Sequence, residues 1–299
     1  MLREEGMVMD DGTTARLDKT HYLMTTTTAN AVAVFRHLEF CHQCLWPDLD
    51  VHLISVTEQY AQFAIAGPNS RRLLEKLIDP KEDISNDTFP FMACGTILIC
   101  GGVKARLFRI SFSGELAFEI AVPARYGNSM MRALMEAGEE FGVTAYGTEA
   151  LGVLRIEKGH VAGNELNGQT TARQMGLGRM VSQKKDSIGL VLSRREQMVG
   201  DDDYELVGLK PLDPKVSLIA GAHFIAVGAA STAENDEGWV TSVAYSPHLK
   251  TFIGLGYIRR GSRRHGDIVR AIDLLGDQDI KVKLTSQHFY DAEGTRLHG

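Results

Sequence analysis

The chain has 299 residues, of which 44% are hydrophobic and 23% are charged, and its formal net charge is -6 at pH 7. A chain of this length can bury a sizeable core in about two or three subdomains, and its acidic balance argues against non-specific binding to nucleic acid or membrane surfaces. Apolar runs such as residues 95–103 and 217–230 are too short or too rich in glycine to span a bilayer.

The N-terminal residues are acidic and contain no apolar segment of the kind that a secretory signal needs. Four cysteines are present, and Cys41 and Cys44 have the CxxC spacing that can suit zinc or a redox dithiol. Because only one CxxC is present and it lies at the end of a predicted helix, we interpret the pair as two unconnected thiols. This cysteine usage favours a reducing, cytoplasmic compartment.

The first predicted elements are two strands joined by an acidic turn. Residues 7–9 and 13–17 have strand character and flank Asp10, Asp11 and Gly12, and another β-rich run follows at 23–28. By itself, Asp-Asp-Gly is ordinary turn chemistry. No element precedes the first strand to pair with it, and we therefore expect a polypeptide that begins in the middle of a domain.

Helical hydrophobic spacing predicts four helices, at residues 28–46, 70–78, 125–141 and 148–159. Thr28 is the expected N-cap of the first helix. In the last helix, Ala150, Val153 and Leu154 are expected to face the core. Strands are predicted at residues 51–65 and within residues 95–122, and residues 160–189 are predicted to be glycine-rich loop.

The stretch from Phe108 to Ile120 has the alternation of a β-hairpin. Apolar residues at every second position predict two half-buried strands around the turn dipeptide Ser113-Gly114. Glu115 follows the glycine, where its carboxylate lies at the lip of the sheet. This side chain can simply be solvated. It can also bind the amidine-like N–H edge of a heterocycle, because an ionised carboxylate accepts two parallel hydrogen bonds.

After an acidic break at residues 200–204 the pattern becomes all-β. Six short strands are predicted, at residues 204–209, 223–227, 238–246, 252–258, 267–272 and 280–284. Short strands at this rhythm are typical of a small barrel. The predicted fold class is therefore α+β, with mixed α/β subdomains in residues 1–199 followed by a C-terminal β-barrel in residues 200–299.

Ordered segments over nearly the whole chain resemble the folate-binding aminomethyltransferase family, which includes the glycine-cleavage T-protein. Residues 109–120 resemble its "YTGE-x-G-x-E" hairpin, residues 147–159 its "LRLEKG" helix, residues 238–258 its "GxVTS…YSP" run and residues 289–296 its "F-Y-D-P-x-G-x-R" ending. Three departures occur: Phe112 replaces a frequent tyrosine, Glu149 stands where many relatives have arginine, and Ala292 replaces a proline.

The resemblance implies an aminomethyltransferase-like fold and a tetrahydrofolate site, with no metal. Asp11 falls on the catalytic aspartate of the family's "DD-x-x-V-x-R" segment. Glu115, Phe112, Tyr22 and Arg155 are implied as folate-binding residues. For Arg155 an alternative stays open, since it can belong to a helix that packs through ion pairs.

Within that family, residues 164–171, the helix at 147–159 and the Arg-Leu-His-Gly ending look most like sarcosine oxidase α subunits. That resemblance implies capture of the one-carbon unit of oxidised sarcosine, a small-molecule substrate, as 5,10-methylenetetrahydrofolate. It implies β, γ and δ subunits as partners, without nucleic acid or membrane. FAD, FMN and NAD would belong to regions outside this chain or to the partner subunits.

Three alternatives remain. The chain can be a stand-alone aminomethyltransferase of the glycine-cleavage system, acting on a lipoyl-carrier protein. It can also be a structural module that keeps the fold without binding folate, which the departures at Phe112 and Glu149 leave open. The third alternative is the tail of a dimethylglycine or sarcosine dehydrogenase-type enzyme.

Overall fold

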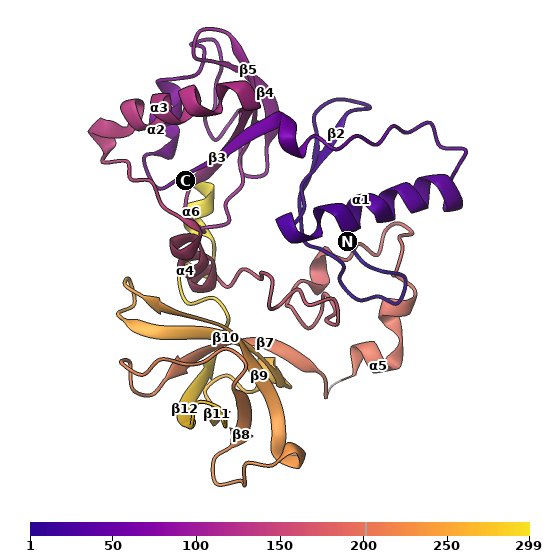
Figure 1. Cartoon of the computed structure of the whole chain (residues 1–299), viewed down its shortest axis with the longest axis vertical. Helices are drawn as coiled ribbons and strands as arrows, with labels where there is room; N and C mark the ends of the chain where they lie inside the picture. Colours follow the sequence, from indigo (N-terminus) through magenta and orange to yellow (C-terminus); the bar gives the residue numbers. More distant parts are fainter. Residues whose placement is uncertain (201) are drawn as a thin grey trace. The chain divides into compact units, whose positions relative to one another are not determined.

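The computed structural model describes residues 1–200 and 202–299, which form two compact units (Figure 1). Unit 1 comprises Met1–Asp11 and Thr148–Ala292, and unit 2 comprises Gly12–Gly147 and Glu293–Gly299. The division between residues 1–199 and 200–299 stays a prediction. The acidic break on which it rests includes residue 201, which lies outside the described residues.

Unit 1 contains a closed barrel of six antiparallel strands in the order β10-β7-β12-β11-β8-β9. The strands are β7 (Tyr204–Pro211), β8 (His223–Ala226), β9 (Asp236–Ser246), β10 (Thr251–Arg259), β11 (Ile268–Asp273) and β12 (Gln278–Thr285). Alternate residues of these strands, such as Val207, Leu209 and Val282, are fully buried inside the barrel. The predicted α+β fold with a C-terminal barrel is confirmed.

The rest of unit 1 is α4 (Thr148–Lys158), α5 (Glu196–Val199) and loops with short 3-10 turns at Gly178–Met180, Leu192–Arg194, Ala233–Asn235 and Gly261–Arg263. The strand predicted at residues 7–9 is reduced to isolated bridges, of which one joins Met7 to Thr171. Val8 N–H donates to Thr170 O at 2.9 Å. Asp10 and Asp11 therefore follow a segment paired with the loop after α4, instead of forming the turn of a hairpin.

Unit 2 is built on an antiparallel sheet in the order β3-β6-β5-β4 (Figure 1). Its strands are β3 (Tyr60–Ala66), β4 (Cys94–Ile99), β5 (Val103–Phe108) and β6 (Ala117–Pro123). Two helices, α2 (Ser70–Glu75) and α3 (Gly127–Gly138), pack their apolar residues against the sheet, where Leu74, Phe118 and Ile120 are fully buried. Short 3-10 turns lie at Thr57–Gln59, Ala124–Tyr126 and Glu139–Phe141.

A small hairpin and a long helix complete unit 2, together with α6 (Thr295–His298) near the end of the chain. The hairpin pairs β1 (Thr14–Arg16) with β2 (Tyr22–Met24). The helix predicted at 28–46 begins as a 3-10 turn at Thr28–Asn30, continues as α1 (Ala31–Phe40) and ends in a π-helical turn at Cys41–Leu45. Thr28 lies inside the 3-10 turn instead of capping α1. Within the part of the chain that the structure describes, the four cysteines form no disulfide.

The predicted hairpin around Ser113-Gly114 exists, but its strands are displaced. β5 ends at Phe108 and β6 begins at Ala117, with Phe108 opposite Glu119. Ile110 and Phe112, which the alternation placed in the first strand, lie in the connection. Arg109, the residue directly after β5, is fully buried.

The inward face of α4 also differs from the expectation. Ala150 is exposed, and Val153 and Leu154 are only partly buried. The buried residues are four in a row at the C-terminal end of α4, namely Arg155, Ile156, Glu157 and Lys158. Three of these carry charges, so local hydrophobic spacing could not identify them.

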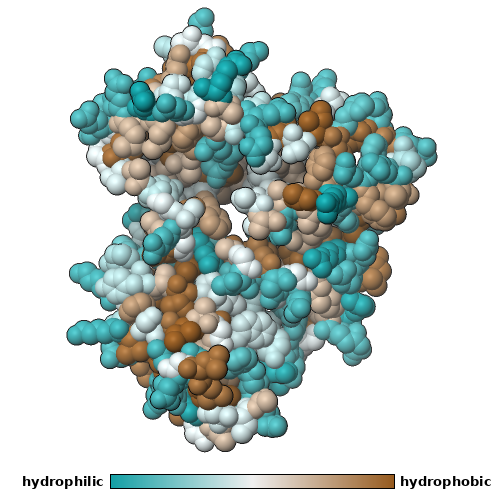
Figure 2. All heavy atoms as spheres, in the orientation of Figure 1, coloured by the Kyte–Doolittle hydropathy of each residue, from teal (hydrophilic) through white to brown (hydrophobic). Residues whose placement is uncertain are grey.

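Exposed apolar side chains gather between residues 32 and 54 of unit 2. They are Val32, Phe40, Leu45, Trp46, Leu49, Val51 and Ile54. Figure 2 shows apolar atoms on the part of the surface where Figure 1 places α1. Exposed apolar patches of this kind mark interaction surfaces. We refer to these residues as the apolar segment 32–54.

Candidate functional site

Glu115 lies on the connection between β5 and β6, and its position depends on a glycine turn. Ser111 Oγ accepts a hydrogen bond from the N–H of Gly114 at 3.1 Å. Gly114 has a φ of 86°, in the left-handed region that other residues rarely adopt. Immediately after this turn, the side chain of Glu115 is 22% exposed. The turn thus positions the backbone of Glu115, and its carboxylate is accessible to solvent.

Arg296 from α6 contacts this carboxylate. Its Nη1 donates to Oε1 and to Oε2 of Glu115, each at 3.1 Å. The donor therefore lies at the edge between the two oxygens, which is also where a bidentate ligand binds a carboxylate. Sequence reasoning did not identify Arg296 as a site residue, because its ending motif indicated only the family.

Two of the predicted site residues in unit 2 carry aromatic rings that lie at the surface. Phe112 lies on the same connection as Glu115 and is 40% exposed. Tyr22 lies on β2 and is 55% exposed, with the guanidinium of Arg16 5.9 Å from its ring centroid. Exposed aromatic faces can stack on heterocycles. The resemblance implies that both residues bind folate.

Asp11 is the last residue of the first stretch of unit 1, and its side chain reaches solvent. Partial burial nevertheless raises the pKa of its carboxyl above the ordinary value of 3.8, and repulsion from Asp10 adds to this. The amino group of Met1 and the side chain of His160 lower the pKa and oppose the shift. A carboxylate with a raised pKa is a better proton acceptor than an ordinary aspartate.

Arg155 points into unit 1 and is 9% exposed. Its Nη1 donates to Glu165 Oε2 at 2.9 Å and to His160 O at 3.2 Å, and its Nη2 donates to Ser242 Oγ at 2.7 Å. Both terminal nitrogens of the guanidinium thus serve protein acceptors. These contacts are those of a helix that packs through ion pairs, the alternative that the sequence analysis left open.

Glu165 is the centre of this network and is fully buried. Its Oε1 accepts hydrogen bonds from Thr241 Oγ1 at 2.5 Å and from Ser242 Oγ at 2.7 Å. Its Oε2 accepts from the N–H of Ala162 at 3.0 Å as well as from Arg155. The buried carboxylate thus accepts four hydrogen bonds, one of them from the guanidinium of Arg155. The sequence signal for Glu165 is the Gly-Asn-Glu-Leu run, which lies in the loop predicted at residues 160–189.

The last turn of α4 adds two more buried charges. Lys158 Nζ donates to Asp291 O at 2.6 Å and to Asp291 Oδ2 at 3.1 Å, and both side chains are less than one-tenth exposed. Glu157 Oε1 accepts from Ser246 Oγ at 2.5 Å. These contacts join α4 to the barrel strand β9 and to the segment after β12.

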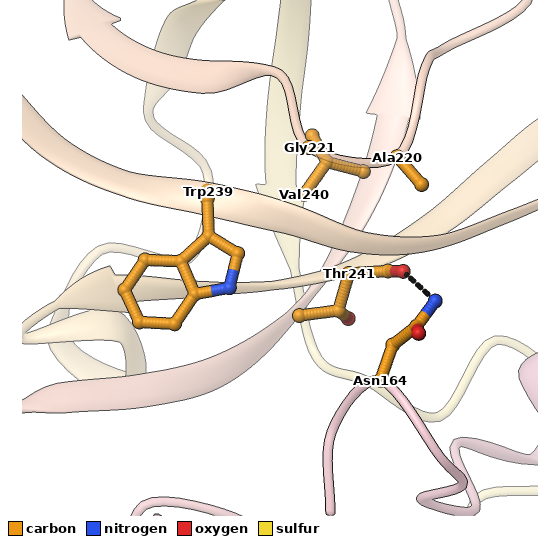
Figure 3. A pocket seen from close by; sticks show the side chains of 6 residues that line it. All are labelled: Asn164, Ala220, Gly221, Trp239, Val240 and Thr241. Atoms are coloured by element: carbon orange, nitrogen blue, oxygen red, sulfur yellow. Dashed lines mark hydrogen bonds between the residues drawn. The ribbon is translucent and has the colours of Figure 1, made fainter. Parts of the chain in front are cut away.

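A recess of about 340 Å³ opens on unit 1 (Figure 3). Its lining residues are Asn164, Ala220, Gly221, Trp239, Val240 and Thr241. Asn164 Nδ2 donates to Thr241 O at 2.7 Å, as Figure 3 shows, while the hydroxyl of Thr241 is directed to Glu165. None of the predicted site residues lines this recess.

The five predicted site residues divide between the two units. Asp11 and Arg155 belong to unit 1, whereas Tyr22, Phe112 and Glu115 belong to unit 2. Phe112 and Glu115 share one connection. In residues 1–200 and 202–299 no group of three or more His, Cys, Asp or Glu side chains could hold a metal ion. Over the same ranges no helix is both long and apolar enough to cross a membrane.

Replacing Gly114 with alanine is expected to destabilise unit 2 by about 1–2 kcal/mol, because a side chain at this positive φ is strained. The midpoint of urea unfolding should fall accordingly. Gly142→Ala is a control for a glycine that also has positive φ but lies far from Glu115 in sequence. An unchanged midpoint for Gly114→Ala would contradict the turn geometry.

Two family models match the chain. The GCVT N-terminal domain matches residues 1–185, and the glycine cleavage T-protein C-terminal barrel domain matches residues 205–291. The sarcosine oxidase subunit alpha of Rhizobium meliloti (strain 1021) is 51% identical over 100% of this chain, which spans 30% of that protein. An aminomethyltransferase of Geobacillus sp. (strain WCH70) is 29% identical over 97% of this chain and 75% of that protein.

The fold has a solved counterpart. The glycine cleavage system aminomethyltransferase T from Bartonella henselae matches 98% of this chain and 75% of its own length, with a TM-score of 0.81 and 22% sequence identity. The chain spans less than a third of the sarcosine oxidase subunit and three quarters of the aminomethyltransferase that it matches. On the two family models, which together cover most of the sequence, the chain belongs to the glycine-cleavage T-protein (GCVT) family.

Proposed function

We propose that the chain is the tetrahydrofolate-binding part of a sarcosine oxidase α subunit, and that it captures the one-carbon unit of oxidised sarcosine as 5,10-methylenetetrahydrofolate. Two findings support this. The full length of the chain is 51% identical to one sarcosine oxidase subunit alpha, against 29% for an aminomethyltransferase. The folate part of the proposal is carried by the observation that both oxygens of Glu115 face a single donor.

The residues present fit a folate. The pterin ring has an amidine-like N–H edge, which a carboxylate binds through two parallel hydrogen bonds. On Glu115, Nη1 of Arg296 stands in for such a donor. Phe112 can contact the ring by stacking but has no hydroxyl to donate, and Tyr22 offers a second exposed ring. We assign Arg155 to holding the loop around Glu165, because its terminal nitrogens already donate to protein acceptors.

The proposed reaction needs few chemical groups from the protein. When bound, tetrahydrofolate supplies the amines that take up the one-carbon unit. We assign to Asp11 the acceptance of a proton at its carboxylate oxygens and the stabilisation of nearby positive charge. Its raised pKa favours this role, because a stronger base holds the proton more firmly. Orientation of the two reactants in one site would supply the rest of the rate.

The single experiment that tests folate binding is calorimetric titration of the chain with tetrahydrofolate, beside the Glu115→Gln variant. Loss of the charged acceptor should weaken binding by roughly 10- to 150-fold, since a hydrogen bond to a charged group contributes about 1.5–3 kcal/mol. Glu140→Gln is the matched control, because Glu140 pairs with Lys76 on the surface of the same unit. Equal affinity of Glu115→Gln and wild type would remove Glu115 from the site.

We further propose that the chain works in a complex with β, γ and δ subunits in the cytoplasm. The apolar segment 32–54 supports this, because a surface with this many exposed apolar side chains is suited to burial against another protein. FAD, FMN and NAD are assigned to regions outside this chain or to those subunits. Stable co-purification of the three subunits from the native source would test the assembly.

A second candidate function is that of a glycine-cleavage aminomethyltransferase acting on a lipoyl-carrier protein. The observation that favours it is the match to an aminomethyltransferase, which is 29% identical over 97% of this chain. Turnover with an aminomethylated carrier protein, in the absence of any oxidase subunit, would decide for this alternative.

A further inference from the structure

The C-terminal segment Glu293–Gly299 belongs to unit 2 and is held there through its main chain. Arg109 is fully buried, and its Nη2 donates to Leu297 O at 2.9 Å. Asn86 Nδ2 donates to Gly299 O at 3.3 Å. The ring of His298 packs edge-on against Phe91 at a centroid distance of 5.2 Å. The buried guanidinium of Arg109 therefore anchors the backbone of α6.

The side chain of Arg296 is far more exposed than the guanidinium of Arg109 that anchors this backbone. Half of it is exposed, and its contact with Glu115 is an ion pair at the surface. Exposed pairs of this kind contribute little, since water competes with the partner and a long side chain loses rotamer freedom in the pair. The guanidinium of Arg296 can thus leave Glu115 while the main chain of α6 stays in place.

The position of Arg296 Nη1 decides whether a ligand can reach the Glu115 carboxylate, whatever the strength of the ion pair. It lies 3.1 Å from both oxygens of Glu115, at the edge between them. Two parallel N–H donors of a heterocycle need the same edge. The guanidinium and a pterin therefore cannot hold Glu115 in this way at the same time.

We propose that Arg296 is a specificity-determining gate on Glu115: its guanidinium occupies the recognition edge of the carboxylate, and only a ligand that offers two parallel N–H donors displaces it. This inference rests on the proposed function, in which Glu115 binds the pterin. Ligands with a single donor or with an anionic edge gain too little to replace a charged partner. The gate also keeps the Glu115 carboxylate paired while no folate is bound.

The test is calorimetric titration of wild type, Arg296→Gln and Arg296→Lys with tetrahydrofolate at low and high salt. Arg296→Gln should bind about two- to fivefold more tightly than wild type, as removal of a competing exposed pair predicts. Arg296→Lys, which keeps the charge, should stay near wild type. High salt should shrink the difference between Arg296→Gln and wild type, because salt screens the competing pair.

A second probe is p-aminobenzoylglutamate, the half of folate that lacks the pterin edge. Its affinity should be the same for wild type and Arg296→Gln, because it lacks the two parallel N–H donors that the gate requires. Equal or weaker tetrahydrofolate binding by Arg296→Gln overturns the gate, and the proposed function survives if Glu115→Gln still weakens binding. Absence of binding by wild type and by Arg296→Gln overturns both, whereas binding by Arg296→Gln alone supports the gate.

Discussion

Replacing Glu165 with alanine is expected to lower the free energy of unfolding by about 3–5 kcal/mol, the cost of breaking a buried ion pair by removing one partner. The substitution leaves the guanidinium of Arg155 buried without its counter-charge. The hydroxyls of Thr241 and Ser242 lose their acceptor at the same time. Urea unfolding of the full chain, followed by circular dichroism, measures the change.

Two comparisons make this test specific. Asp202 pairs with Arg260 on the surface of the same unit and is 63% exposed, so Asp202→Ala should cost about 1 kcal/mol or less. Replacing both buried partners, in the double variant Arg155→Met with Glu165→Leu, should recover part of the loss because no charge remains unpaired. If Glu165→Ala and Asp202→Ala lower the free energy of unfolding by similar amounts, the buried network stabilises the fold no more than a surface ion pair does.

Asp11→Asn is expected to slow folate-dependent turnover of the complete complex by roughly 10²- to 10⁴-fold, the usual contribution of a positioned acid–base group. Asparagine has nearly the same shape but cannot accept the proton, so stability and folate affinity should change little. Asp18→Asn is a suitable control, since Asp18 is exposed in the turn between β1 and β2. Unchanged turnover for Asp11→Asn would exclude Asp11 from catalysis.

The raised pKa of Asp11 also predicts the direction of two pH effects. As a base, Asp11 must be ionised, so the acid limb of the rate profile should lie above pH 3.8. For stability, the folded state binds the Asp11 proton more tightly than the unfolded chain does. This contribution is fully present below pH 3.8 and is lost as pH rises through the raised pKa, and Asp11→Asn should remove it from the unfolding curves.

Local patterns in the sequence determined the elements of this protein. The six predicted barrel strands correspond to β7–β12, and the predicted helices contain α1, α2, α3 and α4. Period-2 and helical spacing report which side of an element is apolar, and they succeed where one side faces a core. The family could also be identified from the sequence, because its motifs recur in order along the chain.

Only the tertiary structure decided which polar residues are buried and with what partner. Local spacing predicts that Val153 and Leu154 of α4 face inward, whereas the fold buries Arg155 and Lys158 because their charges find partners outside α4. Arg155 meets Ser242 across 87 residues, and Arg296 meets Glu115 across 181. Charged side chains carry no local signal of burial, since a charge is tolerated inside only when the folded chain supplies its partner. At the proposed site, the distant residue Arg296 likewise occupies the edge of the Glu115 carboxylate.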